Sequence, residues 1–331
     1  MTYTFESTNI THEKLINLFS TNNIDTLIFR NVSFDKLDYI SDFVKQLKHV
    51  EFIDINYDSK EEFLHLQFDN SPNLEYVKFE NVLISSLYDL RNLFLNCTKL
   101  QKVEFINFDT SNVVDIHHMF CNCTSLEHID ITFDTSRVVH MNSIFSNCYS
   151  LKEINLNNIN TSNVIDMYHM FSNCYELEQL DLSNFDTSNV YDIEAMFMNC
   201  ESLNYVNLSS FDTSNVTNMS LMFWRCEKLE TLDLSSFDTS RVMYMDDMFN
   251  GCIELTYLLE NFKYNNMVSV NSMFNGCKKL KRFAFPKLYH YITMKDMFRN
   301  VDSVELTVNI EDKEWIESEL KNNNVNVIVA N

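Results

Sequence analysis

Residues 177–202 read LEQLDLSNFDTSNVYDIEAMFMNCES, and variants of this pattern recur along most of the chain. The clearest marker is a cysteine that returns every 25 or 26 residues, at positions 97, 123, 148, 174, 200, 226, 252 and 277. Self-similarity at a period of about 20–50 residues is typical of solenoids, in which each turn of chain covers the apolar face of the previous turn. The sequence therefore predicts a repeat solenoid.

Each unit of the pattern begins with the signature of a short strand. Leu180 and Leu182 alternate with polar residues, as in a strand that buries one face. An apolar residue follows at Phe185, and the next residues, 186–189, read Asp-Thr-Ser-Asn. Short polar side chains of this kind accept hydrogen bonds from backbone N–H groups at turns and helix starts. A strand followed by a tight polar turn is the expected first half of each unit.

The second half of the unit has a different spacing. Val190, Ile193, Met196, Phe197 and Cys200 follow a helical period, which predicts a short α-helix or 3₁₀ stretch on the outer side. The residue before the repeated cysteine is Asn or Gly in seven of eight units. These two residues share a tolerance for left-handed backbone, so we expect a helix stop at this position. The exception, Arg225, is expected to be mildly strained.

The predicted fold class is an α/β repeat solenoid, an array of 25–26-residue strand–turn–short-helix units. Residues 1–72 keep only strand-like pieces, at 26–34 and 49–57, and are expected to form an irregular N-terminal cap. Residues 73–299 carry the repeats, and residues 300–331 follow the order strand, helix, strand. Atypical ends are expected, because an uncapped end would expose an apolar face.

The composition narrows the classes of partner. Lysine and arginine number 25 and aspartate and glutamate 47, which gives a net charge of −22 over 331 residues. Such a surface repels nucleic acid and anionic lipid and favours cationic partners. The sequence shows no signal-peptide pattern and no apolar run long enough to cross a membrane. A cytoplasmic location is therefore expected, with export to the cell surface by an unconventional route as the alternative.

Nine cysteines could form a disulfide framework, but their placement favours another role. Equivalent side chains in neighbouring turns, about 5 Å apart, would point in parallel rather than toward one another. We therefore expect eight of the cysteines to fill a repeated core position as small apolar side chains. Cys121 lies outside this register.

Stacked units turn every repeat position into a ladder of side chains, and two strand ladders should share one face. Tyrosine and arginine are enriched at interface hot spots, and carboxylates would suit a basic partner. The predicted partner-binding residues on this face are Tyr76, Glu104, His128, Asp130, Asp181, Tyr205, Asp233, Tyr257 and Arg282. The same acidic ladder is also consistent with a solvated face, on which asparagines relieve like-charge repulsion.

Motifs that would indicate catalysis or a cofactor are missing from the sequence. Nothing matches HExxH, paired CxxC or GxSxG, and the aspartates of the turns supply too few oxygens for calcium. We therefore expect no enzyme activity, no cofactor and no metal.

The stretch FDTSNVTNMSLMFWRC (211–226) and its copies at 108–123 and 237–252 resemble the BspA-like leucine-rich repeat. The resemblance covers roughly residues 92–299 and rests on an aspartate turn, a Met-Phe pair and a cysteine in fixed order. It implies a leucine-rich-repeat fold and a role in adhesion or protein–protein contact. The functional hypothesis is a non-catalytic interaction scaffold that presents its strand face to a protein partner. The alternative is a cell-surface adhesin that binds a host or matrix protein.

Overall fold

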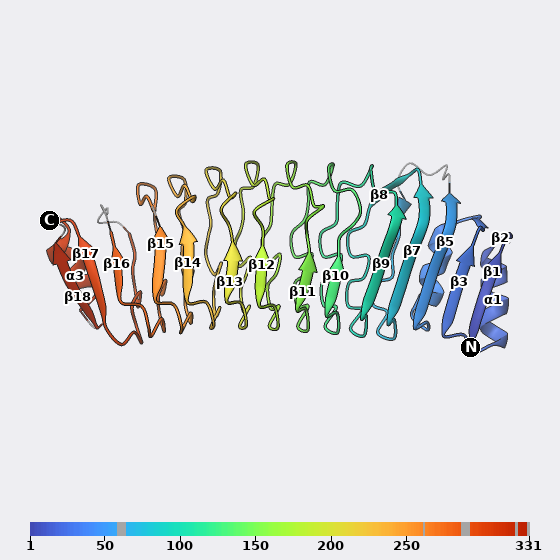
Figure 1. The fold of residues 1–331 in the computed structure, drawn as a ribbon, viewed down its shortest axis with the longest axis horizontal. Coiled ribbons are helices and arrows are strands. Elements are labelled where there is room, and N and C mark those ends of the chain that lie inside the picture. The colour runs from blue at the N-terminus through green and yellow to red at the C-terminus, as the bar shows by residue number, and fades with distance from the viewer. Residues whose placement is uncertain (58–63, 261, 286–291, 322–323, 330–331) are drawn as a thin grey trace. The chain divides into compact units, whose positions relative to one another are not determined.

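The structure, a computed structural model, describes residues 1–57, 64–260, 262–285, 292–321 and 324–329. The chain divides into two compact units, Met1–Asn163 and Val164–Asn331. Within each unit the chain coils so that short parallel strands from successive turns lie side by side (Figure 1). Each unit is therefore a β-solenoid, which confirms the predicted repeat solenoid.

The Met1–Asn163 unit contains a five-stranded parallel sheet in the order β1-β3-β5-β7-β9, together with the strand pairs β2-β4, β6-β8 and β10-β11. Its strands are β1 (Thr2–Glu6), β2 (Asn9–Ile10), β3 (Thr26–Arg30), β4 (Ser33–Phe34), β5 (His49–Tyr57), β6 (Leu64–His65), β7 (Tyr76–Ile84), β8 (Leu87–Asp89), β9 (Lys102–Phe108), β10 (His128–Asp130) and β11 (Glu153–Asn155). Its described helices are α1 (His12–Thr21), the 3₁₀ helix η1 (Leu37–Ile40) and α2 (Ser41–Val44). The strand-like pieces expected at 26–34 and 49–57 are confirmed.

The Val164–Asn331 unit contains the parallel pairs β12-β13 and β14-β15 and the parallel three-stranded sheet β16-β17-β18. Its strands are β12 (Gln179–Asp181), β13 (Tyr205–Asn207), β14 (Thr231–Leu234), β15 (Tyr257–Glu260), β16 (Arg282–Ala284), β17 (Val304–Val308) and β18 (Val325–Val329). Helix α3 (Lys313–Glu319) lies between β17 and β18 in the chain. The strand–helix–strand order expected after residue 300 is therefore correct.

The core is built from columns of equivalent apolar side chains. In the second unit, the ring of Phe197 stacks on that of Phe223 at 5.3 Å between centroids, and Phe223 stacks on Phe249 at 5.6 Å. The first unit repeats the arrangement with Phe94 and Phe120 at 5.4 Å. Burial of one such side chain contributes about 1.5–3 kcal/mol, and a stacked aromatic pair adds about 0.5–1.5 kcal/mol. Stacking of like on like thus holds successive turns in register.

The short outer helix predicted for each unit does not form in the described repeats. Residues 194–199 instead form consecutive hydrogen-bonded turns. The Met196 N–H donates to the Ile193 carbonyl at 3.3 Å, whereas the Phe197 N–H donates to the Met222 carbonyl of the next turn of the coil at 2.9 Å. An α-helix would send both groups to carbonyls four residues earlier and a 3₁₀ helix would send both three residues earlier, and only Met196 follows the 3₁₀ pattern. Bonding to the next turn of the coil interrupts the helical ladder, so the predicted short helix is not confirmed.

Two residues in each of these turns have a left-handed backbone conformation. The residue before each repeated cysteine has φ between 57° at Arg225 and 79° at Gly251, which confirms the expected left-handed stop. A non-glycine residue pays about 1–2 kcal/mol in this conformation. Ion pairs at 3.1 Å to Glu201 and Glu227 hold the strained Arg225 in place. A Cβ at position 251 would lie 3.0 Å from the Arg225 Cγ, so glycine also makes room for this arginine.

A second left-handed residue lies four positions before the first, and the sequence did not reveal it. Leu221, with φ of 60°, is the least expected case, because a leucine seldom adopts this conformation. Equivalent residues are Asn92, His118, Ser143, His169, Ala195, Asp247, Ser272 and Asp296. The side-chain types at this position vary too much to signal a backbone requirement.

The repeated cysteines are buried and form no disulfides, as expected for a core position. Each thiol with a described partner also donates a hydrogen bond to a phenylalanine carbonyl of the preceding turn, as Cys200 does to Phe171 at 3.1 Å and Cys226 to Phe197 at 3.2 Å. The same carbonyl also accepts a backbone N–H, as that of Phe171 does from Cys174 at 3.2 Å, so the thiol is its second donor. Cysteine therefore combines a small apolar volume with an added hydrogen bond between turns.

Burial should make these thiols unreactive in the folded protein. It raises the pKa of Cys200 to about 12 and that of Cys121, the most exposed of the nine, to about 11. Since the thiolate is the reactive form, a thiol-specific chromogenic reagent at about pH 8 should label the native protein slowly, with Cys121 first. In guanidinium without reductant, all nine thiols should react.

The variant Cys121→Ser is the matched control and should remove the earliest phase of labelling. Rapid labelling of several thiols in the native protein would contradict the buried positions. Fewer than nine thiols after denaturation would indicate disulfides.

Candidate functional site

The outward side chains of the strands form the candidate site, which we call the strand face. In the first unit it comprises Tyr76, Lys102, Glu104, His128, Asp130 and Glu153. In the second unit it comprises Gln179, Asp181, Tyr205, Asn207, Thr231, Asp233, Tyr257, Leu259, Arg282 and Ala284. All nine predicted binding residues lie on this face in their respective units.

In the first unit, Tyr76 is engaged by two residues of the neighbouring strand. Its hydroxyl donates to the Glu104 Oε2 at 2.6 Å, and the Lys102 Nζ lies 5.9 Å from the centre of its ring. Lys102 and Glu104 in turn form an ion pair of 2.5 Å. Burial raises the pKa of Tyr76, and the bond from Lys102 keeps the pKa of Glu104 below its usual range. The polar and charged groups of these three residues therefore interact with one another.

The other predicted residues of the first unit also contact one another. The His128 Nε2 lies 3.2 Å from the Asp130 Oδ2, and its Nδ1 lies 3.7 Å from the Glu153 Oε2. Ion pairs this exposed contribute about 0–1 kcal/mol. The strand face of this unit is therefore a polar surface whose charges already have neighbours.

In the second unit, the strand face is hollowed next to an exposed tyrosine. Tyr205 is 52% exposed and lines a cavity of about 340 Å³ together with Asn207, Thr231, Asp233 and Ser235. The Asp233 Oδ1 accepts from the Ser235 hydroxyl at 2.6 Å and from the Ser235 N–H at 2.9 Å. These two bonds lower the pKa of Asp233, so the carboxylate is ionised at neutral pH.

Two further contacts complete the face of the second unit. The Arg282 guanidinium lies 5.8 Å from the centre of the Tyr257 ring, and Tyr257 itself is 43% exposed. Asp181 accepts the Ser183 N–H at 3.0 Å, which lowers its pKa. Asp181 is not among the described residues that line the Tyr205 cavity. The predicted acidic ladder is therefore only partly open to a partner, because each of these aspartates also caps its own turn.

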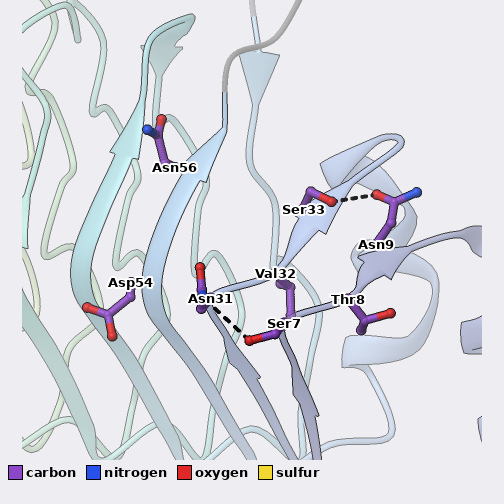
Figure 2. A pocket seen from close by; sticks show the side chains of 8 residues that line it. All are labelled: Ser7, Thr8, Asn9, Asn31, Val32, Ser33, Asp54 and Asn56. Carbon is purple, nitrogen blue, oxygen red and sulfur yellow. Dashed lines mark hydrogen bonds between the residues drawn. The ribbon is translucent and has the colours of Figure 1, made fainter.

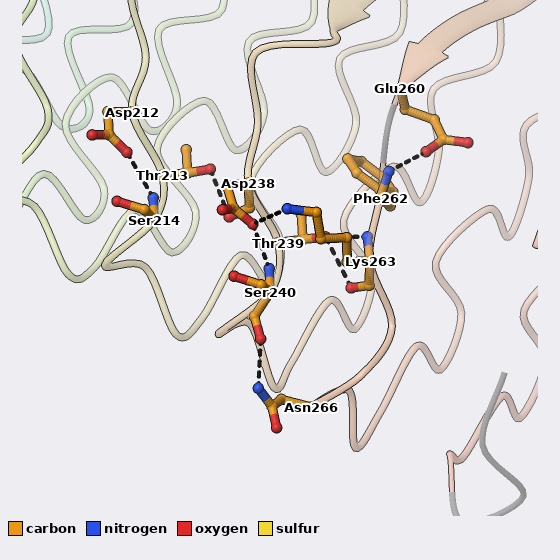
Figure 3. Close-up of polar contacts among 10 residues, drawn as sticks. All are labelled: Asp212, Thr213, Ser214, Asp238, Thr239, Ser240, Glu260, Phe262, Lys263 and Asn266. Carbon is orange, nitrogen blue, oxygen red and sulfur yellow. Dashed lines mark hydrogen bonds and ion pairs between the residues drawn. The ribbon is translucent and has the colours of Figure 1, made fainter. Parts of the chain in front are cut away.

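The Asp-Thr-Ser turns form a second polar array, at the end of the strand face. Figure 3 shows it where the pattern changes, because Lys263 occupies the position of the earlier aspartates. The Asp238 Oδ1 accepts the Ser240 N–H at 2.9 Å and pairs with the Lys263 Nζ at 3.1 Å. The Thr239 hydroxyl donates to the Lys263 carbonyl at 2.9 Å and accepts the Lys263 N–H at 2.6 Å. These bonds confirm the predicted turn chemistry and assign it a structural role.

Replacement of Thr239 should test this role directly. Thr239→Val keeps the volume of the buried side chain but leaves the N–H and carbonyl of Lys263 without their partner. The free energy of unfolding should fall by about 2–4 kcal/mol in a denaturant titration. Thr239→Ser, which keeps the hydroxyl, is the matched control and should cost about 1 kcal/mol. Equal losses in both variants would contradict a bridging role for the hydroxyl.

A polar pocket of about 450 Å³ lies in the first unit, within residues expected to form the N-terminal cap. Figure 2 shows its lining, in which the Ser33 hydroxyl donates to the Asn9 Oδ1 at 2.9 Å and the Asn31 Nδ2 donates to the Ser7 Oγ at 3.3 Å. Asp54 is the only ionisable side chain among the described lining residues. Sequence reasoning missed this pocket, since its residues come from separate turns with no shared motif.

A row of exposed apolar side chains was also missed. Tyr191, Met243 and Val268 occupy the same repeat position, just before the outer turns, and all are exposed. Neighbours in the row are linked through the backbone, as in the Val268 N–H bond to the Met243 carbonyl at 2.8 Å. The position after each buried valine or methionine was visible in the repeat, but the helix prediction obscured which way its side chain points.

The part of the chain that the structure describes was searched for metal sites and for helices that could span a membrane. Within those ranges, no three His, Cys, Asp or Glu side chains group together in a way that could hold a metal ion. The described helices are likewise too short or too polar to traverse a lipid bilayer.

The fold and the repeat define the class of protein as a repeat β-solenoid. The family described as "Mycoplasma protein of unknown function, DUF285" matches residues 64–180, 88–205, 167–285 and 197–315, which together span more than half of the chain. The chain belongs to this family. No curated protein matches it.

Two solved structures show a loose likeness. A leucine rich cell surface protein from Faecalibacterium prausnitzii A2-165 is 17% identical with a TM-score of 0.46, and the match covers 93% of this chain and 83% of that one. A TLR13–ssRNA13 complex is 13% identical with a TM-score of 0.32, and the match covers 98% of this chain and 61% of that one. Scores this low carry no functional inference.

Proposed function

We propose that this protein is a non-catalytic interaction scaffold that binds a protein partner through the strand face of its second unit. The observation that supports this most is the pair of exposed tyrosines, Tyr205 at 52% and Tyr257 at 43%, on a face that also carries the ionised Asp233. Tyrosine supplies a large apolar contact with a polar tip, and it is enriched among the residues that dominate binding energy.

The lining of the Tyr205 cavity supports binding rather than catalysis. A nucleophilic serine needs a base that takes its proton. The Ser235 hydroxyl donates to Asp233, a weak base because its pKa is lowered, and no histidine is found among the described residues that line this cavity. The groups present can orient a partner through hydrogen bonds and charge.

The partner face is tested with the triple variant Tyr205→Ala, Asp233→Asn and Tyr257→Ala. Partners captured from an extract of expressing cells by the unmodified protein should bind at least about tenfold more weakly to this variant, because each change removes an exposed contact. The matched control is Tyr191→Ala, which removes a tyrosine of 49% exposure from a different row. Retention of every partner by the triple variant, or equal loss in the control, would contradict the proposal.

The closer resemblance to BspA-like repeats and the cytoplasmic location belong to the same proposal. The aspartate turn, the phenylalanine column and the cysteine each have a structural role here, which supports the resemblance. Nine cysteines that form no disulfide favour a reducing compartment.

Location is tested by protease treatment of intact expressing cells. The protein should survive until the cells are lysed, with a known surface protein as the digestion control. Degradation on intact cells would contradict a cytoplasmic scaffold and favour the cell-surface adhesin.

A further inference from the structure

The strand face of the first unit contains a complete three-residue arrangement around a tyrosine. Tyr76 and Lys102 are paired in register on adjacent strands, and Glu104 lies two residues beyond Lys102. The ammonium of Lys102 lies 5.9 Å from the centre of the Tyr76 ring and 2.5 Å from a Glu104 oxygen. A cation over an aromatic ring and beside a carboxylate gains from both contacts.

The second unit repeats the spacing of these three residues, with an uncharged residue at the position of the cation. Tyr205, Thr231 and Asp233 have the same sequence spacing as Tyr76, Lys102 and Glu104. All three line the cavity of about 340 Å³. Thr231, at the position of Lys102, carries no charge and is too short to reach over the ring.

A third tyrosine of this ladder also has a cation over its ring. Arg282 follows Tyr257 at the next turn, and its guanidinium lies 5.8 Å from the Tyr257 ring centre. The position two residues after Arg282 is Ala284, so this cluster has a cation without a carboxylate. Among the described tyrosines Tyr76, Tyr205 and Tyr257, a cation lies over the rings of Tyr76 and Tyr257, whereas Tyr205 has a neighbouring carboxylate and is the most exposed of the three.

We propose that the Tyr205 cavity receives a lysine or arginine side chain of the protein partner, which occupies the place that Lys102 fills in the first unit. The cation lies over the Tyr205 ring and donates to Asp233, whose two described hydrogen bonds both fall on Oδ1. The net charge of −22 attracts a cationic segment and repels a second copy of this chain. This inference rests on the proposed function and names the chemistry of the partner at that face.

The test uses the full chain labelled with ¹³C in its tyrosine rings and titrated with Nα-acetyl-arginine methylamide. The Tyr205 signals, assigned through their loss in Tyr205→Phe, should shift with arginine concentration, with a Kd on the order of tens of millimolar or weaker, as expected for one exposed ring contact and one carboxylate contact. The citrulline analogue, which has the same shape without the charge, should leave them in place. Asp233→Asn should weaken the arginine response about two- to fivefold.

The decisive variant is Thr231→Lys, which supplies the amine that Lys102 supplies in the first unit. It should abolish the arginine response, whereas the isosteric control Thr231→Val should retain it. Unchanged signals of the other tyrosines report that both variants are folded. The proposal is overturned if Tyr205 does not respond to arginine, if citrulline acts equally, or if Thr231→Lys responds like the unmodified chain.

The outcome is separable from that of the proposed function. If the triple variant loses its partners but Tyr205 ignores arginine, the partner face stands and the cation subsite is wrong. If Tyr205 binds arginine but the triple variant keeps every partner, the cavity binds a free cation but not the partner's side chain, and both the partner face and the proposed occupant are overturned.

Discussion

The hydrogen bonds between successive turns of the coil are the constraint on which the rest of each unit depends. In the second unit they link Phe197 to Met222 and Phe223 to Met248, and each bond brings equivalent residues of neighbouring turns together. Strands bonded in this way lie about 4.7–4.9 Å apart, so every side chain meets its own counterpart. This arrangement favours residues that stack on or hydrogen-bond to an identical side chain. Examples are the stacked phenylalanines and the Asn122 amide, which donates to Asn96 at 2.6 Å.

The sequence predicted the parts of the fold that repeat with one residue type. The buried cysteines, the strand leucines and the Asp-Thr-Ser turns follow from local chemistry and period alone. The helix prediction failed because apolar spacing does not distinguish a helix from a chain of turns that also points every third or fourth residue inward. Leu221 gave no sign of its left-handed backbone, since its strain is offset by an N–H bond to the Asp246 carbonyl in the next turn of the coil.

The sequence predicted which face carries the candidate site. It did not predict which tyrosine on that face has a cation over its ring and which one borders a cavity. Sequence alternation is enough to orient Tyr76 and Tyr205 outward. What distinguishes them is the residue one turn later, Lys102 in one case and Thr231 in the other, together with the cavity that the shorter side chain leaves. The capping role of Asp233 was not deduced from the strand ladder either, because the bond runs to Ser235 within the following turn.

Asp233 both caps its own turn and lines the Tyr205 cavity, and this limits how tightly the cavity can hold a partner. Its carboxylate already accepts two bonds on Oδ1, so a cation gains one oxygen and one ring face at an exposed site. Contacts of this kind contribute about 0.5–1 kcal/mol each in water. Stable binding therefore requires several ladder positions at once, and Tyr257 and Leu259 are the exposed neighbours on the next strand that can provide them. A solenoid suits this requirement, because substitutions at outward positions cost about 0.5 kcal/mol or less and leave the stacked core unchanged.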